Sequence, residues 1–178
     1  MPKALIRRGI ATDAPALAEI AARTFADAFG ADNHPEDLQA HLSSSYGVTQ
    51  QFQELNDPNV TTLLACASLC VVGYAQIRYH SPPPCVVVDQ PIELHRFYVD
   101  RSAHGTGVAQ ILMAAVRSVA VERGGRHLWL GVWERNPRAI AFYRKVGYAE
   151  VGSTYFCVGS DRQTDRVMVA AVNPQASG

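Results

Sequence analysis

Two short stretches of this chain carry residue types that could do chemistry on a phosphate-bearing ligand. The first is His104–Ala109, with the letters HGTGVA, which follows an apolar run and precedes a helix-like pattern. A glycine-rich turn at a helix N-terminus leaves backbone N–H groups unpaired at the positive end of the helix dipole, where phosphate or pyrophosphate can bind. The second is Asn136–Tyr143, which places a tyrosine on a helix directly after another apolar strand. Together they predict a phosphate-bearing cofactor with an acid/base group beside it.

The glycine turn by itself is a weak signal. Gly105 and Gly107 suggest the G-x-G-x-x-G dinucleotide fingerprint, but Gln110 stands at the third glycine position. The turn also begins well past the preceding strand, and no acidic residue follows at the distance that a ribose contact needs. A dinucleotide site is therefore disfavoured, and a purely structural turn is the alternative.

Length and composition are those of one globular domain. The chain has 178 residues, of which 48% are hydrophobic and 18% charged, and its formal net charge is zero. No overall field favours nucleic acid or a membrane surface, and no apolar run approaches the roughly 20 residues that span a bilayer. The N-terminal residues lack the apolar core of a secretory signal, and the four cysteines form no C-x-x-C pair. We expect a cytoplasmic protein with buried free thiols.

The charges are unevenly distributed along the chain. Residues 9–62 contain eight acidic residues and one basic residue, whereas residues 96–145 contain nine basic and three acidic residues. The basic segment includes the glycine turn, as expected for a polyanionic cofactor. For any single charge, a solvated helix face is the alternative.

The hydrophobic pattern predicts an α/β domain with a central sheet. Apolar residues spaced at i, i+3, i+4 and i+7 from Leu17 to Phe29 predict an amphipathic first helix. The expected helices span residues 13–30, 35–45, 48–55, 105–122 and 136–146. The expected strands span residues 4–8, 60–67, 70–79, 92–99, 127–133 and 164–171, with one more starting at Gly147. Residues 81–84, rich in proline, are expected to form an exposed loop, and the order of elements is typical of a mixed α/β layer.

Taken together, the two stretches resemble the two cofactor motifs of the GNAT superfamily of N-acetyltransferases. Residues Tyr98–Leu112 are similar to its acyl-CoA motif, whose core is Q/R-x-x-G-x-G/A, and Val132–Tyr148 is similar to its second motif. The motifs occur in the expected order and spacing, and the resemblance covers nearly the whole chain. It implies a single-domain GNAT fold over residues 1–172, with a mixed, mostly antiparallel sheet, and a flexible C-terminal tail at 173–178.

A narrower resemblance, to the PaiA-type bacterial polyamine acetyltransferases, rests on segments spread along the chain. These are Thr24-Phe25, Pro35–Asp37, Ile92–Val99, Trp129–Glu134 and Gln163–Met168. That subgroup acetylates spermidine and spermine, so the resemblance implies a polyamine acceptor. One departure is His104, which stands where the motif has Gln or Arg. The remaining motif positions contribute mainly backbone amides, so we expect cofactor binding to survive this change.

The GNAT resemblance also implies roles for individual residues. Tyr143 resembles the tyrosine that protonates the departing CoA sulfur, and a phenol is a neutral proton donor at pH 7. Asn136 resembles the residue that contacts the pantetheine arm, and it also fits a plain helix N-cap. Candidates for the CoA phosphates are Arg138, Arg144 and Lys145. The implied acetyl-CoA-binding residues are Phe97, Tyr98, Val99, His104, Gly105, Thr106, Gly107, Val108, Ala109, Asn136, Ala139, Phe142 and Lys145.

Two side chains on the strand at 92–99 are candidates for the general base. Glu93 lies on the strand that resembles the one lining the acyl-CoA site, where similar enzymes often use a glutamate, and His95 is its competitor. Side chains alternate along a strand. We therefore expect one face to carry Glu93, His95, Phe97 and Val99, and the other Leu94, Arg96 and Tyr98. Backbone N–H groups around Tyr98 and Val99 are expected to polarise the thioester carbonyl.

The sequence thus predicts an acetyl-CoA-dependent N-acetyltransferase that acts on a primary amine by direct attack in a ternary complex, without a metal ion. In GNAT folds the helices after the first strand form one wall of the acceptor cleft, so the acidic segment 9–62 is expected to attract a polyamine. One alternative is an enzyme for proteins, peptides or other small amines, and another is an acyl-CoA-binding regulatory module without turnover. Neither nucleic acid nor a membrane is an expected partner, and a homodimer stays open.

Overall fold

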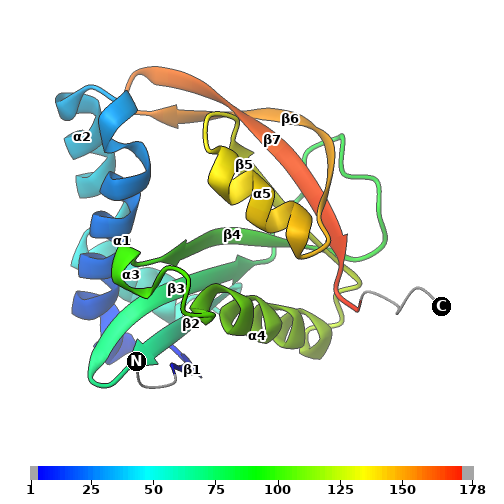
Figure 1. Ribbon diagram of the computed structural model, residues 1–178, viewed down its shortest axis with the longest axis horizontal. Helices are drawn as coiled ribbons and strands as arrows, with labels where there is room; N and C mark the ends of the chain where they lie inside the picture. The colour runs from blue at the N-terminus through cyan, green and yellow to red at the C-terminus, as the bar shows by residue number, and fades with distance from the viewer. Residues whose placement is uncertain (1–3, 174–178) are drawn as a thin grey trace.

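Seven strands form one sheet, in the order β1-β2-β3-β4-β5-β7-β6, in the computed structural model, which describes residues 4–173 (Figure 1). The strands are β1 (Leu5–Arg8), β2 (Val60–Ala67), β3 (Cys70–Arg78), β4 (Pro91–Val99), β5 (His127–Trp133), β6 (Ala149–Val158) and β7 (Asp161–Ala171). In this part of the chain β4 and β5 run parallel, and every other neighbouring pair is antiparallel. The predicted mixed, mostly antiparallel α/β sheet is confirmed.

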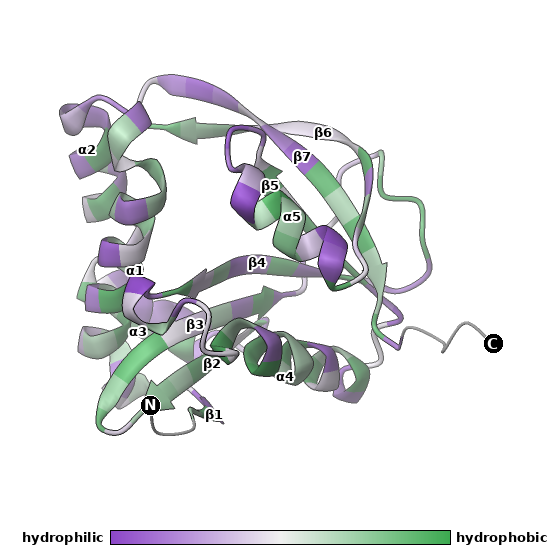
Figure 2. Ribbon diagram, viewed as in Figure 1, coloured by the Kyte–Doolittle hydropathy of each residue, from purple (hydrophilic) through white to green (hydrophobic). Residues whose placement is uncertain are grey.

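Amphipathic helices cover both faces of this sheet. They are α1 (Ala14–Phe29), α2 (Pro35–Ser45), α3 (Val48–Asn56), α4 (Val108–Glu122) and α5 (Pro137–Lys145). Figure 2 shows polar and apolar residues interspersed along the helices, as expected when one side of a helix is buried and the other is solvated. The sheet divides the hydrophobic core. Leu63 and Leu64 are neighbours on β2, yet Leu63 packs in the cluster that contains the buried side of α4 and Leu64 in the one that contains α1.

Strands β4 and β5 pair over a short stretch and then separate. The parallel pairing joins Pro91 to His127, Ile92 to Leu128 and Glu93 to Trp129. Figure 1 shows the two strands diverging beyond this point, so that β5, β7 and β6 lean away from the rest of the sheet. The sheet is therefore open at its centre, next to the residues predicted to do chemistry.

A β-bulge in β4 changes which side chains share a face. The register between β3 and β4 skips His95, which has no partner on β3. Leu94 and Phe97 consequently pack in the same core cluster, although they are three residues apart. The prediction that Glu93, His95, Phe97 and Val99 share one face is therefore wrong, because strict alternation ends at a bulge.

The helix expected from Gly105 begins at Val108 instead. Gly105 and Gly107 adopt φ angles of 75° and 87°, a left-handed conformation that a right-handed helix excludes. Both glycines therefore belong to the turn before α4. At the other end of the chain β7 begins at Asp161 rather than near residue 164, because it continues the hairpin that starts with β6.

The cysteines are free, as predicted, but they are not all buried. Cys66 and Cys85 are partly buried, whereas Cys70 and Cys157 are exposed. Cys70 opens β3 at a hairpin and Cys157 lies on the edge strand β6, which explains why these two positions reach solvent.

No helix among residues 4–173 is long and apolar enough to span a membrane. The predicted flexible tail at 173–178 lies outside the described residues, except for Asn173. The division into a domain at 1–172 and a tail stays a prediction.

Leu112 provides a test of the core under α4. Its side chain is fully buried, so Leu112→Ala should lower the free energy of unfolding by about 2–5 kcal/mol through lost apolar contact and a residual cavity. Urea unfolding followed by circular dichroism measures the change. On the same helix Val121 is 44% exposed, and Val121→Ala should change stability by less than about 1 kcal/mol. Equal losses for both variants would contradict the assigned face of α4.

Candidate active site

A cavity of about 1080 Å³ occupies the region where β4 and β5 separate. Its walls come from both sides of the sheet, because its lining includes core residues that pack with α4, such as Leu94 and Leu130, and others that pack with α1, such as Phe25 and Phe29. A single cavity therefore connects the glycine turn on one side with the helices α1–α3 on the other.

The glycine turn forms one end of this cavity. His104, Gly105, Gly107 and Ala109 all line it. A Cβ atom placed on Gly105 or Gly107 would meet no other atom within 4 Å, so both positions are open to a ligand. The N–H groups in the first turn of α4 have no intrahelical partner. The turn therefore fits a phosphate or pyrophosphate group by its backbone, as predicted.

Arg138 reaches the same end of the cavity from α5. Its Nη2 atom lies 2.7 Å from Nε2 of His104, which also lies 2.9 Å from the carbonyl oxygen of Val99. Because one ring nitrogen cannot donate to the carbonyl and accept from the guanidinium at once, only one of these two contacts can be a hydrogen bond. Arg138 has no acidic partner among the described residues. Its charge is thus available for an anion. It lies beside His104, the residue that stands where the sequence motif has Gln or Arg.

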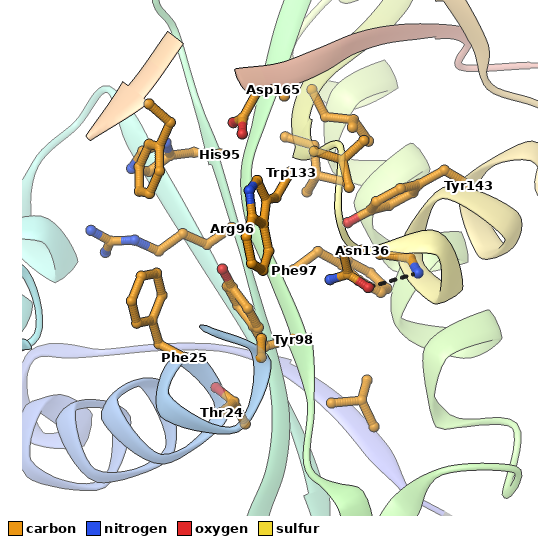
Figure 3. A pocket seen from close by; sticks show the side chains of 18 of the residues that line it. Thr24, Phe25, His95, Arg96, Phe97, Tyr98, Trp133, Asn136, Tyr143 and Asp165 are labelled. Carbon is orange, nitrogen blue, oxygen red and sulfur yellow. Dashed lines mark hydrogen bonds between the residues drawn. The ribbon is translucent and has the colours of Figure 1, made fainter. Parts of the chain in front are cut away.

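Tyr143, on α5, lines the same cavity. Its ring packs edge-on against Phe97, Phe142 and Tyr148, and Figure 3 shows its hydroxyl directed into the pocket. Burial raises the pKa of the Tyr143 phenol above its usual value, because a buried phenolate loses its hydration. The group is therefore a neutral proton donor over the physiological pH range.

Backbone amides of β4 face the space between the strands. The N–H of Asp100 donates to the carbonyl of Val72 at 2.9 Å, continuing the antiparallel ladder with β3. Because every second residue points its N–H toward the partner strand in such a ladder, the amides of Val99 and Phe97 point away from β3 and toward the gap. They can polarise a carbonyl there.

Glu93 and His95, the two candidate bases, contact each other at the cavity wall. Glu93 accepts a hydrogen bond from Nε of Arg78, and its Oε1 lies 3.4 Å from Nδ1 of His95. Burial opposes the ionisation of Glu93, but hydrogen bonds from His95 and Arg78 outweigh it and hold the pKa below its usual value. Burial lowers the pKa of His95 below its usual value, and the Glu93 carboxylate offsets only part of this effect. At neutral pH the pair is a partnered carboxylate and a neutral imidazole.

Aromatic rings line the other end of the cavity. Phe25 stacks on Phe29 with ring centroids 4.3 Å apart, and Phe29 stacks on Trp133 at 5.1 Å. Further rings there belong to His41, Tyr46 and Phe156. An apolar, π-rich surface of this kind accepts alkyl chains and also attracts cations.

The sequence of the chain identifies the family. A sequence profile of the Acetyltransferase (GNAT) family matches residues 15–148. This chain belongs to the GNAT family. It is 34% identical over 158 residues to an uncharacterized N-acetyltransferase of Mycobacterium tuberculosis, a match that covers 89% of this chain and 97% of the relative. An uncharacterized N-acetyltransferase of Lactobacillus delbrueckii is 30% identical over 160 residues, covering 90% and 92%.

Solved structures support the fold of this GNAT protein. The PaiA N-acetyltransferase of Thermoplasma acidophilum, solved in complex with coenzyme A, superposes with a TM-score of 0.76 at 16% sequence identity, covering 94% of this chain and 98% of the other. The predicted single-domain GNAT architecture is confirmed. As a GNAT family member the protein is an acetyl-CoA-dependent N-acetyltransferase, which confirms the predicted enzyme class and cosubstrate.

The GNAT cavity gathers most of the predicted site residues, but not all. Those that line it are Tyr143, Glu93, His95, Phe97, Tyr98, Val99, His104, Gly105, Gly107, Ala109, Asn136, Ala139 and Phe142. Asn136 is also a true helix cap, since its Oδ1 accepts from the N–H of Ala139 at 3.2 Å. Three predicted residues are absent from the lining. Thr106 turns its hydroxyl back to Ala103, Val108 is buried in the core, and Lys145 is exposed.

The acidic segment 9–62 contributes little charge to the cavity. Of its eight acidic residues only Asp27 and Glu54 line the cavity. Glu54 forms an ion pair with Arg96 at 2.6 Å, and Asp27 lies 3.9 Å from Arg101. The expectation that this segment forms an acidic wall of the cavity is therefore wrong. Helix α1 and its neighbours turn their apolar sides toward the cavity and most of their charges outward.

Two features of this GNAT site escaped the sequence analysis. One is the network in which Glu54 accepts from both Arg96 and Gln76, tying α3 to β4 and β3; nothing in the sequence pairs these three positions. The other is Asp165 on β7, which lines the cavity. A signal for it existed, since strand alternation puts Asp165 on the same face as the buried Val167 and Val169, and a carboxylate on an apolar face is unusual.

The glycine turn can be tested with a matched pair of variants. Gly107 and Gly124 lie before and after α4, both at positive φ and both with open space where a Cβ atom would stand. Gly107→Glu should abolish acetyl-CoA binding in calorimetry, because it puts bulk and negative charge where the pyrophosphate would lie. Gly124→Glu carries similar backbone strain and should bind acetyl-CoA normally. Unchanged affinity in Gly107→Glu would overturn the assignment of the turn.

Proposed function

We propose that this protein transfers the acetyl group of acetyl-CoA to a primary amine of a small cationic molecule, with polyamines such as spermidine and spermine as the acceptor class. The observation that carries this is a single cavity lined by the glycine turn, by Tyr143 with its hydroxyl directed inward, and by aromatic rings and carboxylates. Such an arrangement suits a donor with phosphates and an acceptor with alkyl segments and positive charge.

The residues at the donor end have separate tasks. The backbone of the turn at Gly105–Gly107 and the Arg138 guanidinium bind the phosphates, and the Asn136 side chain contacts the pantetheine arm. The amides of Phe97 and Val99 hydrogen-bond the thioester carbonyl and stabilise the negative charge that forms on its oxygen during attack.

Two titratable groups carry out the proton transfers, His95 on β4 and Tyr143 on α5. His95, held by Glu93, takes a proton from the acceptor ammonium, and the free amine attacks the thioester carbon. The carbon–sulfur bond breaks and Tyr143 gives its proton to the departing thiolate. The new amide nitrogen loses its second proton to the phenolate, which restores the phenol, and His95 releases the proton of the ammonium to solvent.

The outer end of the cavity favours a small acceptor over a polypeptide. Asn33 accepts a hydrogen bond from Nε2 of Gln163 at 2.6 Å, and Asp37 accepts one from the N–H of Ser160 at 3.1 Å. These bonds join the start of α2 to the β6–β7 hairpin, which meet at one side of the molecule (Figure 1). Since His41 of α2 and Phe156 of β6 line the cavity, a polypeptide laid across this end would have to break the bridge.

The test is a measurement of CoA thiol release from acetyl-CoA with a panel of acceptors. The panel contains spermidine, spermine, simple monoamines and short peptides. Saturable turnover with polyamines is expected. Turnover with peptides alone would discard the acceptor class while keeping the chemistry. Tight acetyl-CoA binding without turnover on any acceptor would support the regulatory-module alternative.

Tyr143→Phe isolates the proposed acid. The ring and its packing against Phe97 and Phe142 remain, and only the hydroxyl is lost. We expect kcat to fall tenfold or more, in line with the usual size of general acid catalysis, with little change in acetyl-CoA affinity by calorimetry. Wild-type kcat in this variant would remove the phenol from the mechanism.

Glu93→Gln separates the two candidate bases. The Glu93 carboxylate raises the pKa of His95, so its removal should lower that pKa further. If His95 is the base, the acidic limb of the pH dependence of kcat moves to lower pH, because the imidazole stays neutral over a wider range. Disappearance of the limb in Glu93→Gln would instead make Glu93 the base.

A further inference from the structure

Asp165 is a carboxylate on the cavity wall that the mechanism above does not use. It lies on β7, where its register partners are Trp133 of β5 and Thr154 of β6. Its Oδ1 atom is buried and accepts no hydrogen bond. Figure 3 shows the carboxylate directed from β7 into the pocket. A buried carboxylate oxygen without a donor is costly, so its persistence at a cavity wall calls for a ligand that supplies one.

The neighbouring strand leaves room for this carboxylate. Trp129, Gly131 and Trp133 follow one another on the same face of β5 and line the cavity. A Cβ on Gly131 would come within 3.1 Å of Oδ2 of Asp165, closer than an ordinary contact. The glycine between two tryptophans therefore keeps the space beside the carboxylate open.

The charges around the cavity single out Asp165. Of the lining carboxylates, Glu93 is paired with Arg78, Glu54 with Arg96, and Asp27 lies near Arg101. Asp165 has no ion-pair partner among the described residues. It is the lining carboxylate left free to bind a cation, just as Arg138 beside the glycine turn is free to bind an anion.

We propose that Asp165 binds the positive charge of the acceptor amine and thereby sets the enzyme's preference for cationic acceptors. This inference rests on the proposed function, since it assigns the acceptor-binding group of the same site. An ammonium beside Asp165 would donate to the unpartnered Oδ1, with the rings of Trp133 and Phe156 around its alkyl chain.

The surroundings of Asp165 make this binding sensitive to pH. Burial and the nearby charge of Glu134 raise the pKa of Asp165 to about 6. On β6 its partner Thr154 is uncharged, and across the cavity Arg78 and His95 are engaged with Glu93. Protonation below about pH 6 removes the negative charge, so acceptor binding should weaken there while the acceptor itself stays cationic.

Asp165→Asn is the variant that tests the proposal, because it keeps the shape and removes the charge. The KM for spermidine at pH 8 should rise about ten- to a hundredfold, the range typical of a lost charge-assisted hydrogen bond. The acetyl-CoA affinity should not change. The rise of the spermidine KM below about pH 6 should disappear in the variant, whereas the acidic limb of kcat that belongs to His95 should remain. An unchanged KM at pH 8, or a low-pH rise of KM that persists in the variant, would overturn the proposal.

Two further variants act as controls. Glu150→Gln removes an exposed carboxylate from the neighbouring strand β6, outside the cavity lining, and should leave the spermidine KM unchanged. Glu134→Gln removes the nearby charge that, after burial, helps to raise the pKa of Asp165, so the low-pH rise of the spermidine KM should move to lower pH. A rise that does not move in Glu134→Gln would contradict Asp165 as its origin.

Thermal unfolding distinguishes a binding role from a structural one. When the pKa of a carboxyl group is higher in the folded state than in the unfolded state, the protein loses stability as the pH rises from the unfolded-state pKa to the folded-state pKa. Asp165→Asn should therefore melt at a higher temperature than wild type at pH 8, with no difference below about pH 4. A lower melting temperature at pH 8 would show that Asp165 supports the fold and would overturn the proposal.

The failure of this inference and the failure of the proposed function can be told apart. If the wild-type enzyme acetylates no amine, the proposed function itself fails. If the wild type acetylates amines and Asp165→Asn does so equally well, only this inference fails.

Discussion

The short parallel pairing between β4 and β5 is the constraint on which the site depends. The two strands are joined at three residue pairs, ending at Glu93 and Trp129, and then separate. Separation frees the N–H groups of β4 that would otherwise pair with β5, and it lets side chains from both faces of the sheet reach one cavity. Rings line the opening, with Phe97 against Phe142 and Phe29 against Trp133. A fully paired sheet would have no place for a thioester between its strands.

The charged groups around the cavity are arranged in keeping with this separation of β4 and β5. Most ionised groups around the cavity neutralise one another in pairs, as Arg96 does with Glu54, and so contribute to holding the elements together. Arg138 at the donor end and Asp165 at the acceptor end have no ion-pair partner among the described residues. The unpaired Oδ1 of Asp165 is buried, which costs stability, and proteins keep such groups mainly where a ligand uses them, whereas Arg138 is exposed. A cation beside the glycine turn and an unpaired carboxylate on β7 match a polyanionic donor and a cationic acceptor.

The β-bulge at His95 links the fold to the chemistry. By inserting one residue without a partner on β3, it puts Phe97 in the core cluster of Leu94, under α4, instead of on the face of Glu93. A regular strand would hold Glu93, His95 and Phe97 on one face and would move Phe97 away from Tyr143. Bulges are common beside active sites because they redirect side chains in this way.

The sequence alone determined the features that depend on neighbouring residues. Turn glycines, the N-cap at Asn136, the helix periodicity and the two cofactor motifs are local patterns, and they predicted the α/β fold, the phosphate seat and the tyrosine donor. The tertiary structure decided which charges meet across distant segments. The pairing of Glu54 with Arg96, the isolation of Asp165 and the outward direction of most acids in residues 9–62 depend on how elements pack. Pairing energies fall off within a few ångströms, so they depend on three-dimensional separation, which the order of residues does not specify.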